Sequence, residues 1–388
     1  MMKDDHWPSL ISSAVAAVVV GFASTVLVVM QSADAVGASE AQKISWAAML
    51  CLAMGGLSLF LSWRHKMPMI IAWSTPGAAL LVTSAHGVAY TAALGAFAVA
   101  GLLAALTGLV APLARAIERM PAGVASAMLG GVLLSYVMKV PAAALAMPWQ
   151  VVPLVVAFFV LRLWKPMWTV PIVVALGLGL AALGGLLRFE ARDFALAQLT
   201  FDWPEFSFAA IISLGLPLYL VTMASQNLPG FAVLRTFGYR PPVTSALVTT
   251  GLASALLSPI MGPQVNMAAI TASLATGPDT HPDTGQRWKV AIPYFVIYGA
   301  FALAAGLFVK VLGALPGELV HAIAGLALFS PLMGAMQAMM KEPKEVEASL
   351  VTFLITASGV VVFGIGAPFW GLVIGLALWG AKKQLVKK

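Results

Sequence analysis

The sequence is poor in charged residues and in cysteine. Only 10% of its 388 residues are Asp, Glu, Lys or Arg, and its one cysteine is Cys51. A single cysteine excludes an intramolecular disulfide and any cysteine cluster that binds a metal. The chain also lacks the His-Glu-x-x-His and Gly-x-Ser-x-Gly motifs of metalloproteases and hydrolases. We therefore expect neither an enzyme nor a bound metal or cofactor.

Long apolar stretches dominate the chain instead. Hydrophobic residues make up 61% of it and the mean hydropathy is +0.94, whereas a soluble domain is about 45–50% apolar. This composition predicts an all-α polytopic membrane protein. The net charge of +7 does not indicate nucleic-acid binding, because the basic residues are scattered singly and in pairs. The one basic cluster is typical of a cytoplasmic end near anionic lipid, and it comprises Lys382, Lys383, Lys387 and Lys388.

Fourteen apolar segments are predicted spans, seven in each half of the chain, although several are shorter than the roughly 20 residues of a full crossing. Those of the first half are 10–30, 44–63, 68–85, 90–113, 121–139, 148–163 and 168–187. Those of the second half are 207–233, 241–260, 262–276, 290–311, 317–337, 348–366 and 368–381. An odd number of spans per half requires the second half to be inverted, which predicts a 7+7 inverted repeat.

Two of these segments, spans 3 and 10, carry signals for a broken helix. In the first, Ser74 and Thr75 precede Pro76-Gly77, a combination that caps and begins a helix in the middle of apolar sequence. Residues 260–277 repeat the pattern with Gly-Pro followed by a short helical run. Paired broken segments in the two halves indicate a transporter's binding site. We therefore expect residues 70–87 and 260–277 each to form an extended piece followed by a half-helix. The alternative is that the two segments are ordinary spans with coincidental Pro-Gly kinks.

Charge placement predicts the orientation. With fourteen crossings, 17 of the 22 Lys and Arg residues fall on the side of the two termini, and the other five are Lys43, Lys139, Arg188, Arg192 and Lys310. Basic residues concentrate in cytoplasmic loops. Both termini are therefore expected in the cytoplasm.

Several segments resemble the bacterial benzoate/proton symporter (BenE) family, in order and through almost the whole chain. The segments are Gly21-Phe22-Ala23-Ser24, 71–80 (IAWSTPGAAL), 223–230 (MASQNLPG), 240–243 (RPPV), 266–272 (NMAAITA) and 276–278 (TGP). The block at 71–80 is the most specific of them.

The resemblance implies a fold similar to that of nucleobase/proton symporters and sulfate-type anion transporters. It implies a core domain, 1–113 with 207–312, that carries spans 1–4 and 8–11. It further implies a gate domain, 114–206 with 313–388, that carries spans 5–7 and 12–14. Elevator-type alternating access and homodimers through the gate domain are expected from the same likeness.

Helix amino ends attract carboxylates, so the two broken spans are the predicted substrate site. Side-chain donors there are Ser74, Thr75, Gln264 and Asn266, and Gly77 would allow close approach to the backbone. Neither broken segment has a carboxylate, which favours an anion over a nucleobase. Ser225 and Gln226 of the eighth span complete the polar set. The aromatic ring of the substrate needs an apolar slot, and the candidates for its walls are Phe22, Met223 and Met267. For each of these three residues, core packing without a role in binding is the alternative.

Few ionisable residues could carry a coupled proton. His86 follows the first broken span, and Glu318 and His321 begin the twelfth, three residues apart and so on one helix face. Ionisable groups within a membrane are functional candidates, although all three lie near a predicted surface where a solvated role is the alternative.

The function expected from the sequence is secondary active import of benzoate, or a similar aromatic carboxylate, with protons across a bacterial inner membrane. The partners are then this small molecule, protons and the lipid bilayer. The alternative is an anion channel or exchanger of the same fold.

Overall fold

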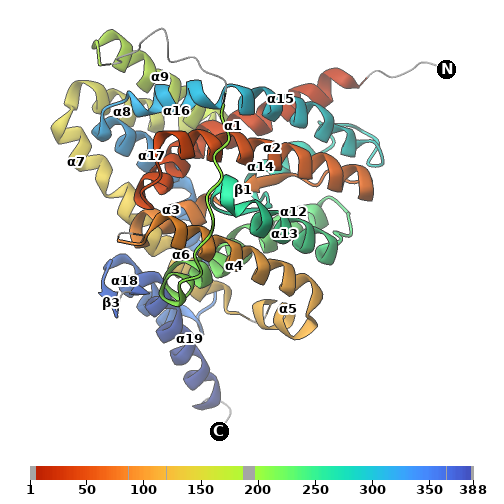
Figure 1. The fold of residues 1–388 in the computed structure, drawn as a ribbon, viewed down its shortest axis with the longest axis vertical. Coiled ribbons are helices and arrows are strands. Elements are labelled where there is room, and N and C mark those ends of the chain that lie inside the picture. The colour runs from red at the N-terminus through yellow and green to blue at the C-terminus, as the bar shows by residue number, and fades with distance from the viewer. Residues whose placement is uncertain (1–5, 86, 119, 187–196, 364, 386–388) are drawn as a thin grey trace.

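The computed structural model describes residues 6–85, 87–118, 120–186, 197–363 and 365–385 (Figure 1). In the first half the helices are α1 (Trp7–Ala35), α2 (Glu40–His65), α3 (Thr75–Ser84), α4 (Tyr90–Leu109), α5 (Ala111–Glu118), α6 (Ala122–Val137), α7 (Lys139–Ala146), α8 (Pro148–Trp164), the 3-10 turn η1 (Pro166–Trp168) and α9 (Thr169–Leu183).

The second half begins with one long helix that contains two π-helical turns: α10 (Phe208–Ala210), η3 (Ile211–Gly215), α11 (Leu216–Thr222), η4 (Met223–Asn227) and α12 (Leu228–Thr236). It continues with α13 (Val243–Met261), α14 (Ile270–Thr276), the 3-10 turn η5 (Arg287–Val290), α15 (Ala291–Leu303), α16 (Ala305–Gly313), α17 (Gly317–Met339), α18 (Val346–Ala357) and α19 (Ala367–Leu385). The strands are β1 (Ile71–Trp73), β2 (Val265–Met267), β3 (Val361–Val362) and β4 (Ile365–Gly366).

The structure is that of a polytopic membrane protein. In its described part, eight helices are long and apolar enough to cross a bilayer, or nine if the bent pair 287–303 and 305–313 forms one span. Other predicted spans correspond to shorter helices, such as α8 and α18. The count of fourteen and the inverted repeat therefore stay predictions.

The two predicted broken segments are extended pieces followed by short helices. β1 leads into α3, and β2 into α14. The strands pair antiparallel with Ile71 opposite Met267 and Trp73 opposite Val265. Pairing continues on both sides, because Ala268 N–H donates to the Ile70 carbonyl (2.9 Å) and Ser74 N–H to the Gln264 carbonyl (3.1 Å). Irregular backbone within apolar surroundings needs such partners, since lipid offers none.

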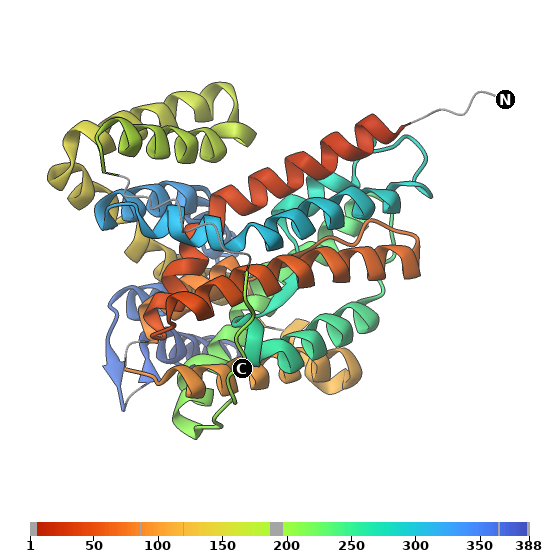
Figure 2. The same cartoon turned by 45° about the horizontal axis from the view of Figure 1, so that its top comes forward.

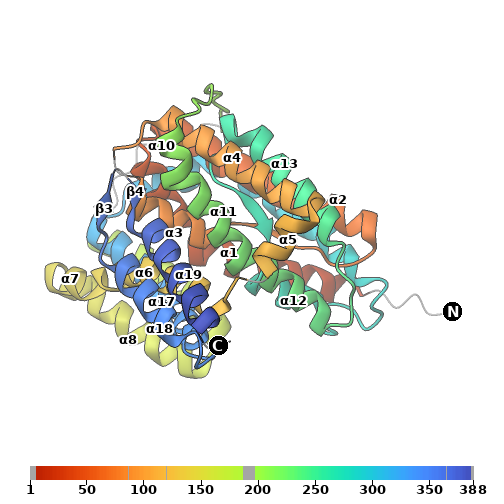
Figure 3. The ribbon, with the colours of Figure 1, turned by 90° about the horizontal axis from the view of Figure 1, so that it is seen from below.

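The helices gather in two groups beside these strands. In one group α4 packs against α13, and α15 packs against both α1 and α2. Helices α1, α15 and α2 run side by side (Figure 2). In the other group α6 packs against α17 and α18, and α18 against α19. Figure 3 shows α11 between the groups, with α6, α17, α18 and α19 on one side and α2, α4 and α13 on the other. The division into core and gate domains at the stated boundaries stays a prediction.

One predicted span ends earlier than expected. The segment 348–366 was predicted to be a single span, but α18 stops at Ala357 and the hairpin β3–β4 follows. Gly359 has a φ of 65°, a left-handed conformation that ends a helix, and the β-branched pair Val361-Val362 favours a strand. The protein is thus not entirely α-helical, and this hairpin was not predicted.

Candidate functional site

A cavity of about 1080 Å³ lies where the two helix groups meet at the start of α3. Its walls come from α1, α3, η4, α12 and α14 on one side and from α6, η1, α9 and α17 on the other. The polar residues that line it are Thr25, Thr75, Ser126, Ser225, Gln226, Ser273, Ser330 and Lys341. The larger apolar residues are Val20, Met120, Leu129, Leu133, Met167, Val170, Leu228, Leu274 and Leu328.

The start of α3 places Thr75 in this cavity. Ser74 is the N-cap, and its Oγ accepts the Gly77 N–H (3.1 Å) and lies 2.7 Å from Thr222 Oγ1. The Ser74 hydroxyl is thus engaged inside the protein, and Pro76 has no N–H to offer. Thr75 lines the cavity, and within the described chain its hydroxyl has no hydrogen-bond partner. Thr75 is therefore the side-chain donor that α3 presents to a ligand.

The π turn η4 supplies a second set of polar groups. A π turn widens a helix locally and is frequent at functional sites. Ser225 Oγ donates to the Val221 carbonyl (2.5 Å), whereas the Gln226 side chain has no partner among the described residues. The next residue, Asn227, is buried and its Oδ1 accepts the Met267 N–H (3.0 Å). Asn227 thus fixes η4 against β2, which holds Gln226 beside the start of α14.

A third unpartnered group faces these two from the other side of the cavity. Ser126 on α6 lines it, and no described residue hydrogen-bonds to its hydroxyl. Lys341 is the one charged residue in the described lining. Apolar walls with a few converging polar groups, and no acidic residue in the described lining, suit an amphipathic anion better than a cation or a sugar.

Several predicted site residues lie elsewhere. Phe22 is buried in an aromatic cluster, with ring centroids 4.8 Å from Phe301 and 5.0 Å from Phe308. Gly77 faces α11, since a Cβ at this position would collide with Leu218. Met223 and Met267 are buried core residues. None of these four residues is in the described lining of the cavity.

The remaining two polar candidates are fully buried near the strands. In the amide orientation that satisfies both of its polar atoms, Asn266 accepts the Ser74 N–H (3.0 Å) and donates to the Met267 carbonyl (2.9 Å). Gln264 is 1% exposed, and neither its Nε2 nor its Oε1 has a partner in the described part of the chain. Neither side chain is in the described lining of the cavity.

The sequence reasoning missed residues that the structure places in the cavity. Thr25 lies on α1, three residues after the predicted Phe22, and its Oγ1 accepts the Trp73 Nε1–H (2.6 Å). Ser126, Ser330 and Lys341 come from the other helix group. A search for polar residues in apolar helices would have found the hydroxyl groups, but not the direction in which they point.

A second cavity, of about 590 Å³, contains one of the proton candidates. His321 lines it together with Asp34, Glu40, Lys43 and Lys310. Lys43 pairs with Asp34, and Lys310 Nζ lies 3.9 Å from Glu40 Oε1. Glu318 is exposed in the first turn of α17, and His86 lies outside the described residues.

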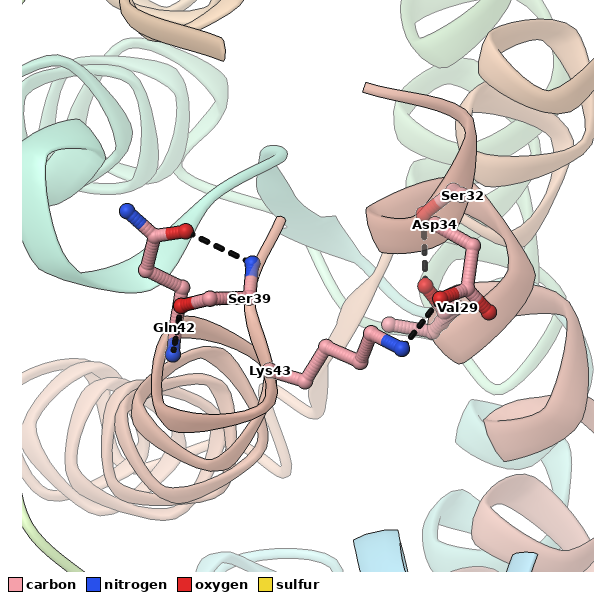
Figure 4. A network of polar contacts seen from close by, with 6 residues as sticks. All are labelled: Val29, Ser32, Asp34, Ser39, Gln42 and Lys43. Atoms are coloured by element: carbon pink, nitrogen blue, oxygen red, sulfur yellow. Dashed lines mark hydrogen bonds and ion pairs between the residues drawn. The ribbon is translucent and has the colours of Figure 1, made fainter. Parts of the chain in front are cut away.

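Figure 4 shows the polar contacts around the turn between α1 and α2, where Asp34 and Lys43, two residues that line this second cavity, lie. The Lys43–Asp34 ion pair joins the two helices, and Ser39 and Gln42 form a reciprocal capping box at the start of α2. The Ser39 N–H donates to Gln42 Oε1 (2.7 Å) and the Gln42 N–H to Ser39 Oγ (3.3 Å). The capping box thus orders the start of α2, the helix that carries Glu40 and Lys43.

Comparison with known proteins decides the family. The sequence profile of the benzoate membrane transport protein family matches residues 4–380. The chain belongs to this family. It is 37% identical to the inner membrane protein YdcO of Escherichia coli over 372 residues, 95% of this chain and 94% of the relative. It is 30% identical to the benzoate membrane transport protein of Acinetobacter baylyi, with 97% and 95% covered. Family membership and the apolar helices support a multi-pass protein of a bacterial inner membrane.

Solved structures share the fold. The transmembrane domain of the cyanobacterial bicarbonate transporter BicA superposes with a TM-score of 0.61 at 13% identity, covering 97% of this chain and 98% of that one. The murine anion transporter Slc26a9, in its inward-facing state, gives the same TM-score at 11% identity and covers 100% of this chain and 70% of that one. Family and fold together point to a membrane transporter.

Proposed function

We propose that this protein imports benzoate, or a closely similar aromatic carboxylate, together with protons. The observation that carries the proposal is the cavity at the start of α3. Three polar side chains without a protein partner in the described chain, Thr75, Gln226 and Ser126, project from three elements into apolar walls. Its volume, about 1080 Å³, lies at the upper end of small-molecule sites and leaves room for water around one aromatic ring.

The carboxylate is placed at the start of α3, between Thr75 and Gln226. The Thr75 hydroxyl and the Gln226 amide each donate one hydrogen bond to it, and Ala269 brings the start of α14 to the same place. The partial positive charge of the helix ends adds attraction. Because the Gly77 N–H already donates to Ser74, side chains contribute more of the binding at α3 than the backbone does.

The ring lies against apolar side chains of the second helix group. Leu129 and Leu133 of α6, with Leu328 of α17, line the cavity opposite Thr75. Transport then requires the group around α3 and α14 to slide as a core domain past a gate domain built on α6 and α17. This is the elevator motion implied by the family resemblance, and homodimers would form through the gate domain.

Proton coupling is assigned to His321. It lines the second cavity, whose residues 34–43 and 309–317 lie in turns predicted to face away from the cytoplasm. The charged groups that face it are Glu318 on its own helix, Lys139 on α7, and the two ion pairs of the cavity. A residue that takes up a proton for import must be reached by water from the outer side of the membrane. His321 would meet this requirement, because it lines this cavity.

Uptake into proteoliposomes tests the function. Labelled benzoate should accumulate above its external concentration when the outside is made acidic, and a protonophore should abolish the accumulation. Equilibration without accumulation would indicate a channel, and accumulation driven only by a second anion inside would indicate an exchanger. Competition by substituted benzoates, but not by uracil or sulfate, defines the substrate class.

A further inference from the structure

Among the described residues that line the proposed substrate cavity, one is basic and none is acidic. Lys341 follows α17 and is the one charged residue in the described lining. Its side chain is exposed, and no described residue forms a hydrogen bond or ion pair with it. A solvated lysine on a membrane protein's surface is common, but this one lies at the edge of a cavity that is otherwise apolar and weakly polar.

A second cationic side chain, that of Arg162, contacts a residue that lines the same cavity. Arg162 Nη1 donates to Ser330 Oγ (2.6 Å), a lining residue, and the guanidinium lies 5.3 Å from the Phe329 ring centroid. Among the described residues no carboxylate pairs with Arg162. The guanidinium is thus fixed by a hydroxyl and a ring, and its charge remains available to act on the cavity.

The acidic residues that follow Lys341 in the sequence are not among the described residues that line the cavity. Glu345 Oε2 accepts the Gly123 N–H (2.9 Å) at the start of α6, and Glu342 is exposed and is not among the described lining residues. A cleft with one sign of charge and low-dielectric walls concentrates the oppositely charged ligand. The occupant must be an anion small enough to pass into the cavity.

We propose that Lys341 is a capture residue for the substrate carboxylate at the cytoplasmic mouth of the cavity, with Arg162 reinforcing its field. The proposal rests on the proposed function for the identity of the anion. The anion pauses at Lys341 between the site at Thr75 and the solvent, so that Lys341 raises the affinity for anionic over neutral ring compounds. Lys341 is here a specificity-determining residue and not the primary binding group.

The experiment measures the dissociation constant of labelled benzoate with purified full-length protein in detergent. It compares Lys341→Gln with Lys341→Arg and with Lys344→Gln, a matched control three residues later that is exposed and absent from the described lining. Each is measured at about 10 mM and about 1 M salt, where the Debye length is about 30 Å and about 3 Å. One unit charge a few ångströms from the ligand in a water-rich mouth corresponds to a change of about three- to tenfold.

We expect Lys341→Gln to raise the dissociation constant about three- to tenfold at low salt, with the difference shrinking at high salt. Lys341→Arg and Lys344→Gln should match the wild type. Equal constants for Lys341→Gln and the wild type would overturn the inference, as would an equal effect of Lys344→Gln, which would indicate general surface charge. The same constants are also measured after reconstitution into vesicles of anionic lipid, and an effect seen there but absent in detergent would assign Lys341 to a lipid phosphate and overturn the inference. If the wild type itself does not bind benzoate, the proposed function fails, and this inference fails with it.

Discussion

Thr75 is the residue on which the proposed carboxylate site depends most directly. Its hydroxyl faces the cavity and has no partner in the described chain. Thr75→Val keeps the shape and removes the donor, so benzoate affinity should fall about tenfold or more, the equivalent of a lost hydrogen bond to a charged group of about 1.5–3 kcal/mol. Thr75→Ser retains the hydroxyl and is the control. Equilibrium binding of labelled benzoate measures both, and unchanged affinity in Thr75→Val would remove Thr75 from the site.

A substitution of Gln264 distinguishes a structural role of this residue from a role in ligand binding. Gln264 is fully buried and both polar atoms of its side chain lack a partner in the described chain, which costs about 1–3 kcal/mol for each unsatisfied group. Gln264→Met has a similar length and no polar atoms. We expect a higher thermal unfolding temperature and unchanged benzoate affinity.

The opposite result for Gln264→Met is equally informative. A drop in affinity of about tenfold or more, with no gain in stability, would restore Gln264 to the binding site. Thermal unfolding and ligand binding on the same preparation distinguish the two outcomes.

The positions of polar residues were predictable from the sequence, but their directions were not. Thr75, Ser225 and Gln226 were predicted site residues and line the cavity. Asn266 and Met267 were chosen from the same motif and are buried in β2, where successive side chains point to opposite faces. In a helix that is apolar all around, periodicity does not distinguish the cavity face from the packed face. Phe22 was therefore as plausible as Thr25.

At the scale of elements, the cap of α3 links the broken segment to the eighth span. Ser74 Oγ accepts the Gly77 N–H and lies within hydrogen-bond distance of Thr222 Oγ1. Ser74→Ala removes the cap, which costs about 0.5–2 kcal/mol, and leaves the buried Thr222 hydroxyl without this partner. The melting temperature should fall by several degrees. Benzoate affinity should change less than in Thr75→Val.

Thr83→Ala is the matched control for the cap. Thr83 is on the same helix, and its hydroxyl donates to the Leu80 carbonyl one turn earlier (2.9 Å). Its other partner is Ser84 of the same helix, so among the described residues the Thr83 hydroxyl bonds to no other element. Its removal should change the melting temperature by much less than Ser74→Ala does. Equal effects of the two substitutions would contradict a special role for the cap.

The elements that the sequence predicted are those with local signals. Pro76-Gly77 after Ser74 marks a helix start, and the structure has β1 and α3 there. The π turns η3 and η4 carry no such mark, because a single extra residue per turn leaves the apolar pattern of the segment unchanged. The pairing of β1 with β2 also depends on contacts between distant halves of the chain, which local propensity does not encode.

For the whole molecule, the distribution of basic residues predicts where the two cavities open. Lys341 lines the larger cavity and Lys43 and Lys310 the smaller one, and the positive-inside rule assigns them to opposite sides. Tags on either terminus should be accessible only from the cytoplasm, as measured by impermeant labelling of intact cells and of inverted vesicles. Labelling of one terminus from outside intact cells would contradict the fourteen-span arrangement.

Coupling between the two cavities is the last property of the whole molecule that can be tested. His321 belongs to α17, the same helix that contributes Leu328 to the proposed substrate cavity. A proton on His321 can therefore influence the helix against which the ring is proposed to lie. Histidine is the side chain whose charge most readily changes near neutral pH, so external acidification can protonate His321.

His321→Gln keeps a polar side chain that cannot take up a proton. We expect this variant to lose benzoate accumulation driven by a proton gradient, and to lose the rise in uptake that external acidification produces. Exchange of external labelled benzoate for internal unlabelled benzoate needs no net proton movement and should persist. His281→Gln, in the loop between α14 and η5, is the control and should behave like the wild type. If His321→Gln accumulates benzoate as the wild type does, the proton carrier lies elsewhere, and Glu318→Gln is then the next variant to measure, since Glu318 begins the same helix face one turn earlier.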